Sequence, residues 1–160
     1  MNNVLKFMAM MAPALAVACA NTQTPAQIAA DVANLAGGVA AAAQTLRNGG
    51  MLPAQQQAAV DNAVSALQAA ATAVAQATTA NAQKSATEQA VEAFNAVTAA
   101  LAGAKGMPQN VTTILTAAEV LLPTIEALAG LPVTTTASAP AMTPDEANSI
   151  LSSAKATLHE

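Results

Sequence analysis

Apolar side chains recur at alternating spacings of four and three residues along most of this chain, which places them on one face of a helix. The boundary between the second and third of these helical stretches contains neither glycine nor proline, so one continuous rod is the alternative there. The sequence predicts an all-α fold, an alanine-rich antiparallel bundle of four or five helices. The predicted helices are 24–48, Pro53 to Thr78, Ser85 to Lys105, 111–128 and a shorter one from Thr143 onward.

Local signals indicate where some of these helices begin. Thr24 precedes Pro25, and Gln27 follows the threonine three residues later, which is typical of a capping box. Ser85 with Glu88 has the same spacing and predicts a second capping box at the start of the third helix.

Two features predict how the helices pack. Gly37 and Gly38 lower helix propensity in the middle of the first helix, which favours close approach by a neighbour over a bend. The fourth helix has the broadest apolar stripe, which predicts that it is the hub of the core. Its opposite face should meet water, so that the carbonyl group freed by the proline is solvated. That face consists of Thr112, Thr116, Glu119, Pro123 and Glu126.

The chain after residue 131 is expected to form a linker and a last helix. Residues 132–142 are mostly small, which is typical of a semi-extended linker. Thr143 and Pro144 open the last helix, 143–160, with acidic residues in its first turn. A helix of this length is marginal alone in water, so its apolar face must dock on the bundle, on another copy or on a partner. That face consists of Ala147, Ile150, Leu151, Ala154 and Leu158.

The amino-terminal residues have the parts of a secretory signal peptide. Lys6 and the free amino group give a positive head, an apolar run follows, and small residues lead to Cys19. We expect residues 1–18 to be an export signal and residues 19–23 a short tether before the helical bundle of residues 24–131.

The stretch Leu15-Ala16-Val17-Ala18-Cys19 resembles the lipobox of bacterial lipoproteins, and Cys19 is the only cysteine in the chain. The resemblance implies that the Cys19 sulfur carries a diacylglycerol and that cleavage leaves this residue as the acylated amino terminus. Lipidation at Cys19 and a membrane partner are therefore expected. In such lipoproteins an acidic residue after the cysteine tends to hold the product in the inner membrane. Ala20 is not acidic, which implies the outer membrane.

Two other interpretations of the leader stay open. An ordinary signal peptidase site is present at Ala16-Val17-Ala18 or at Ala18-Cys19-Ala20. An uncleaved leader would be a membrane anchor or an amino-terminal helix packed into an assembly such as a virus particle. For an anchor, the apolar span from Val4 to Ala20 is at the short limit for crossing a bilayer.

Composition favours a helical bundle and argues against a nucleic-acid partner. The chain is 54% hydrophobic but only 1% aromatic, so a core must be built from Val, Leu, Ile and Ala. Alanine has the highest helix propensity, and seams rich in alanine let helices approach closely. Only 9% of the residues are charged and the net charge is -4, so the sequence has no basic stripe that could neutralise phosphates.

No sequence motif indicates catalysis, a metal or a cofactor. His159 is the only histidine and lies beside the carboxyl terminus, where we expect a solvated chain end. Glu88 and Glu92 are one helical turn apart, but bundle metal sites also need Glu-x-x-His motifs, which the sequence lacks. The serines have neither a usable histidine base nor a Gly-x-Ser-x-Gly turn. We therefore expect no enzyme activity and no cofactor.

The expected function is that of a non-catalytic exported lipoprotein with a structural or protein-interaction role at the cell envelope, at the outer membrane or its periplasmic face. Its partners would be the membrane, through acylated Cys19, and a second copy or another protein, through the heptad faces. One alternative is a self-assembling component of a phage or virus particle that retains its hydrophobic amino terminus. A second alternative is a periplasmic helical module that binds a small apolar ligand.

Overall fold

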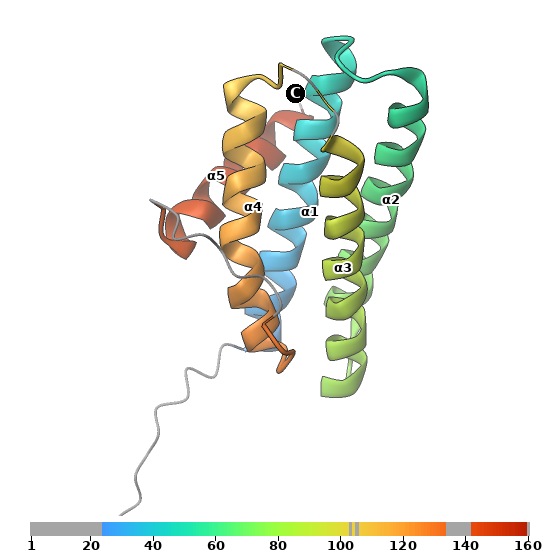
Figure 1. The fold of residues 1–160 in the computed structure, drawn as a ribbon. Helices are drawn as coiled ribbons and strands as arrows, with labels where there is room; N and C mark the ends of the chain where they lie inside the picture. The colour runs from blue at the N-terminus through green and yellow to red at the C-terminus, as the bar shows by residue number, and fades with distance from the viewer. Residues whose placement is uncertain (1–23, 103, 105, 134–141, 160) are drawn as a thin grey trace, which may run out of the picture.

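The computed structural model describes residues 24–102, 104, 106–133 and 142–159 (Figure 1). Within these residues the chain forms helices and no strand, so the predicted all-α helical bundle is confirmed. The second and third predicted helices are separate rather than one continuous rod. The helices are α1 Pro25–Asn48, α2 Ala54–Gln76, α3 Ala80–Leu101, α4 Gln109–Leu128 and α5 Pro144–Ala156, and a short 3-10 helix, η1, covers Thr157–His159.

Helix α1 begins and ends where its local signals predict. The backbone N–H of Thr24 donates to Oε1 of Gln27 over 2.7 Å, which is half of the predicted capping box. At the other end Gly50 adopts a φ of 63°, and the N–H of Met51 donates to the carbonyl of Leu46 over 3.0 Å. This is a Schellman closure, in which a left-handed glycine lets the chain satisfy the last carbonyl groups of the helix.

The predicted start of the third helix at Ser85 is wrong. Helix α3 begins at Ala80, and the hydroxyl of Thr79 accepts a hydrogen bond from the N–H of Ala82 over 3.2 Å. Ser85 is an exposed residue inside the helix. Ser85 and Glu88 are equally suited to the solvent-exposed face inside a helix, so their capping-box spacing does not mark a helix start here.

Helix α1, and not α4, is the hub of the bundle. It contacts all four other helices, whereas α4 contacts α1, α3 and α5. Figure 1 shows α2 and α3 on one side of α1 and α4 and α5 on the other, with successive helices from α1 to α4 running in alternating directions. The prediction that α4 is the hub was wrong, because a broad stripe of large side chains does not determine how many helices can pack around a helix. Small residues on several faces of α1 do so, and those that are buried include Ala36, Gly37, Gly38, Ala40, Ala41, Ala42 and Ala43.

The solvent-exposed face predicted for α4 is correct for its first three members, whereas Pro123 is half-buried and Glu126 is buried. Thr112, Thr116 and Glu119 are exposed, but Glu126 is only 2% exposed. A heptad line drifts by about 20° per heptad around a straight helix, so a position two heptads after Thr112 has turned toward the core. The helix continues through the half-buried Pro123, and it ends in a second Schellman closure, at Gly130 with a φ of 66°.

Helix α5 docks on the bundle, against α1 and α4. Its buried residues are Ala147, Leu151 and Ala154, from the face that the sequence predicted. A Cβ atom on Gly38 would lie 2.5 Å from Cδ2 of Leu151, so the glycine pair of α1 marks close packing, as predicted, and α5 is the neighbour. Because the residues between α4 and α5 lie largely outside the described ranges, the predicted linker 132–142 can be assessed only at its ends.

The core is aliphatic and contiguous within the described residues. Phe94 is its one buried aromatic side chain in that part of the chain. Because alanine supplies much of the buried surface, close approach of backbones takes the place of large side chains. The largest fully buried side chains are Phe94, Leu35, Leu46, Leu67, Leu121, Leu122, Ile125 and Leu151.

Candidate functional site

The predicted lipidation residue, Cys19, lies outside the described residues, but the structure shows which end of the bundle follows it. Thr24 is the first described residue, and α1 starts directly after it. The start of α1 is joined to α3, because Nε2 of Gln83 donates to the carbonyl of Pro25 over 2.8 Å. Figure 1 shows the start of α1, the connection between α2 and α3, and the end of α4 at the same end of the bundle. We call residues 24–27, 77–84 and 128–133 the proximal end.

The surface of the proximal end is apolar or uncharged apart from one lysine. Val133 is 54% exposed, and Leu128 and Leu131 are half-buried. Among the described residues the only other large hydrophobic side chain with comparable exposure is Met51, 37% exposed, which follows the far end of α1. Lys84 is the only charged residue in the proximal end. From the sequence alone, Val133 belongs to the predicted linker 132–142 and has no predicted role.

A polar cluster joins α5 to α1. The Asn148 side-chain amide donates to Oδ1 of Asp31 over 2.8 Å, and the Asn34 amide donates to Oδ1 of Asn148 over 2.8 Å. Asp31 is 8% exposed. Burial raises the pKa of the Asp31 carboxyl, the hydrogen bond from Asn148 opposes that shift, and the charge of Asp145 adds to it. The cluster therefore fixes the register of α5 on α1 and carries a carboxylate at the interface.

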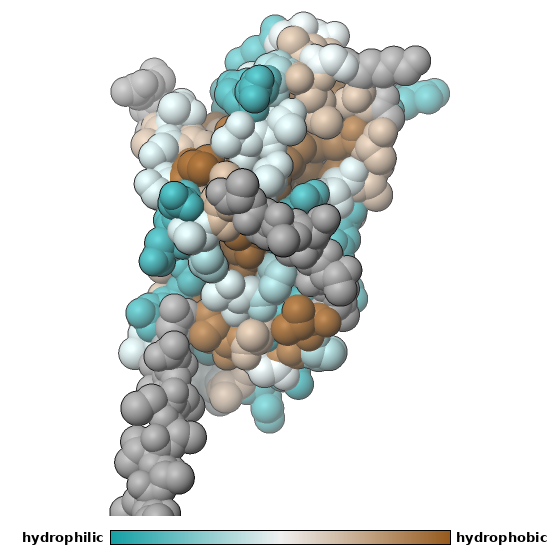
Figure 2. All heavy atoms as spheres, turned by 60° about the vertical axis from the view of Figure 1, so that its left-hand side comes forward, coloured by the Kyte–Doolittle hydropathy of each residue, from teal (hydrophilic) through white to brown (hydrophobic). Residues whose placement is uncertain are grey.

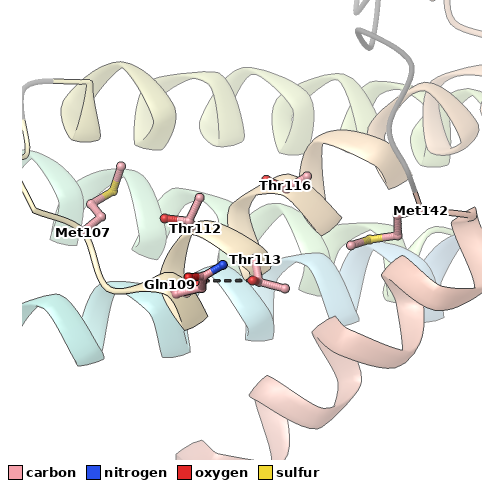
Figure 3. Close-up of a pocket in the computed structure, with 6 residues that line it drawn as sticks. All are labelled: Met107, Gln109, Thr112, Thr113, Thr116 and Met142. Atoms are coloured by element: carbon pink, nitrogen blue, oxygen red, sulfur yellow. Dashed lines mark hydrogen bonds between the residues drawn. The ribbon is translucent and has the colours of Figure 1, made fainter.

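A hollow of about 510 Å³ lies over the outer face of α4. Figure 3 shows threonines of α4 between Met107 and Met142. Two of these hydroxyls donate back to their own helix, Thr112 to the carbonyl of Pro108 over 3.3 Å and Thr113 to the carbonyl of Gln109 over 2.9 Å. Because these donors are already used within the helix, the arrangement does not indicate a polar ligand.

An apolar hollow of about 410 Å³ lies between α1, α2 and Leu158. Ala36 and Gly37 from α1 and Ala71 from α2 form its floor, and Gln68 and Lys155 lie at its edge. Its volume is in the lower part of the range for small-molecule pockets. It arises because small side chains face each other across the two helices, and no buried polar group points into it.

Across the described ranges no three His, Cys, Asp or Glu side chains come together as a metal site. Glu88 and Glu92 are exposed on α3.

Two of the described helices, Pro25–Asn48 and Gln109–Leu128, are long and apolar enough to cross a membrane. However, 67% and 56% of the tested spans are buried inside the bundle. Core helices of soluble proteins pass the same test of length and composition. Their hydropathy is therefore explained by their places as the hub and a packed neighbour of the bundle.

Comparison with protein-family models, with curated proteins and with solved structures gave no match for this chain.

Proposed function

We propose that the protein is a non-catalytic exported lipoprotein, held at the cell envelope by acyl chains on Cys19, with a structural or protein-interaction role. The observation that carries the proposal is the position of the only cysteine, at the end of an apolar leader and after Leu15-Ala16-Val17-Ala18. The start of α1 at Pro25 supports it, because the folded bundle begins a few residues after the proposed processing site. The contiguous core within the described residues supports a bundle that does not depend on the leader.

Acylation would supply firm attachment to the membrane. Each buried methylene of an acyl chain contributes about 0.8 kcal/mol, so two or three chains hold a protein firmly where one chain gives reversible binding. The bundle would then act as a rigid body close to the membrane surface. Its contribution would be contact with other envelope proteins or with a second copy.

The mass of the mature protein tests the proposal directly. We expect a chain that starts at Cys19 and carries lipid. Cys19→Ala should shift the protein from the membrane fraction to the soluble fraction, whereas Ala20→Ser, beside the modified residue, should leave it in the membrane fraction. Wild-type protein without lipid on Cys19, together with unchanged fractionation of Cys19→Ala, would exclude the lipoprotein function.

The assembly alternative makes the opposite prediction for the same measurements. An unmodified chain that starts at Met1, together with a large particle in size-exclusion chromatography, would identify a building block that retains its leader. A soluble monomer without lipid would instead leave the ligand-binding alternative, for which the hollow between α1 and α2 is the place to test.

A further inference from the structure

We infer that the proximal end of the bundle is a lipid-contacting surface, on which the bundle stands end-on with Val133 in the headgroup region of the membrane. This inference rests on the proposed lipoprotein function and adds the orientation of the bundle and the residues that meet the lipid. Three observations carry it, one from the sequence between Cys19 and Thr24 and two from the described residues of the proximal end.

The first observation is the length of chain between the proposed anchor and the bundle. Five residue steps separate Cys19 from Thr24. A fully extended chain spans at most about 3.3–3.6 Å per residue, so this tether reaches no more than roughly 18 Å. The far end of α1 is 24 residues further along a helix that rises by about 1.5 Å per residue. The lipid on Cys19 would therefore enter the membrane within roughly 18 Å of the start of α1, which brings the proximal end to the membrane surface. The other two observations favour an end-on over a side-on bundle.

The second observation is the exposed apolar side chains at that end. Val133 is 54% exposed, and it follows Leu131, whose N–H is fixed to the carbonyl of Glu126 over 2.8 Å. The Schellman closure at Gly130 thus holds this short apolar segment at a defined place at the end of α4. Figure 2 shows hydrophobic side chains on the lower part of the molecule, toward the end at which α4 finishes, as well as higher up the same face.

The third observation is the distribution of charge. The chain has net charge -4, yet the proximal end contains no acidic residue, and its only charged residue is the basic Lys84. Acidic side chains near an anionic lipid surface would be repelled, whereas a lysine there is attracted. The end that the tether brings to the membrane therefore carries the charge pattern that a lipid surface tolerates.

Single tryptophans can test this orientation because the natural chain contains none. Val133→Trp places the probe at the proximal end, and Met51→Trp places a matched probe at the far end. Each full-length lipidated variant is reconstituted into vesicles of phosphatidylethanolamine and phosphatidylglycerol, with and without brominated acyl chains. We expect blue-shifted emission and bromine quenching for Val133→Trp, and neither for Met51→Trp.

Two outcomes overturn the inference. Unquenched Val133→Trp on vesicles that retain the protein would show that this end does not meet lipid, and equal quenching of both probes would show that the bundle has no end-on orientation. Pro132→Trp, on the same exposed segment, gives a second probe if Val133→Trp fails to fold, as judged by far-UV circular dichroism. The mass of each sample separates failure of the inferred orientation from failure of the proposed function. Lipid on Cys19 without quenching at position 133 would overturn the orientation but leave the lipoprotein function standing.

Discussion

Gly38 of α1 lies so close to Leu151 of α5 that an added Cβ atom would be 2.5 Å from Cδ2 and 3.3 Å from Cα of the leucine. Gly37 has a similar relation to Lys155, whose Cγ would be 2.4 Å from a Cβ at that position. A glycine inside a helix costs about 0.8–1 kcal/mol relative to alanine. The packing free energy gained between α1 and α5 must therefore exceed the loss of helix stability that Gly37 and Gly38 cause in α1.

Gly38→Ala should destabilise the protein, because the clash with Leu151 exceeds the gain in helix propensity. Overpacking of a core costs about 1–3 kcal/mol, and we expect a loss in this range in urea unfolding followed by far-UV circular dichroism. In a Leu151→Ala background the same change should cost clearly less, because the closest atom, Cδ2, is gone and only the 3.3 Å approaches to Cα and Cβ of residue 151 remain. If Gly38→Ala alone stabilised the protein, α1 and α5 would not be in close contact at Gly38 and Leu151.

Asp31→Asn should stabilise the protein at neutral pH. Burial raises the pKa of Asp31 above its ordinary value of 3.8, so the folded state favours the protonated carboxyl. The stability from this group is complete below pH 3.8 and is lost as the pH rises through the higher pKa of the folded state. Asparagine imitates the protonated form and can still accept the hydrogen bond from Asn148.

The stability difference between Asp31→Asn and the wild type should therefore be positive at pH 7 and shrink as the pH falls toward 3.8. Urea unfolding at several pH values measures it. A wild-type protein that is more stable than Asp31→Asn at pH 7 would show that the charge-assisted hydrogen bond from Asn148 outweighs the burial of the carboxylate.

Thr79→Ala should cost about 1 kcal/mol, the usual loss when a capping side chain is removed. The reason is the hydrogen bond that the Thr79 hydroxyl accepts from the N–H of Ala82. Ser85→Ala is the matched control and should be neutral or slightly stabilising, because Ser85 is exposed inside α3, where alanine is the better helix former. If Ser85→Ala lowered the thermal unfolding temperature more than Thr79→Ala did, the third helix would begin at Ser85, as the sequence predicts.

Local signals predicted the helices well because caps and apolar spacing act over a few residues. They predicted the starts of α1 and α5 and the packing role of Gly37 and Gly38. These local signals do not predict which helices far apart in the sequence contact each other. The central place of α1 depends on small residues on several faces, and Asp31 and Asn148, which hydrogen-bond, are 117 residues apart. The proposed anchor, Cys19, was found from sequence alone, whereas the exposure of Val133 required the fold.

The start of α5 gives a pH effect opposite to that of Asp31. One carboxylate oxygen of Glu146 accepts a hydrogen bond from the backbone N–H of Thr143 over 2.8 Å and another from its hydroxyl over 3.0 Å. These bonds lower the pKa of Glu146 below its ordinary value of 4.5. The stability from this cap is therefore complete above pH 4.5 and is lost as the pH falls through the pKa of the folded state.

In the Asp31→Asn background the loss of α5 stability at low pH should be measurable without the opposite pH effect of the Asp31 carboxyl. Amide hydrogen exchange of α5 should become faster as the pH falls below 4.5, after correction for the intrinsic rates. A further Glu146→Gln change should remove this pH dependence, because glutamine does not titrate. Persistence of the acid weakening in the double variant would show that it arises elsewhere than at the Thr143 cap, and that α5 is released in acid by a different group.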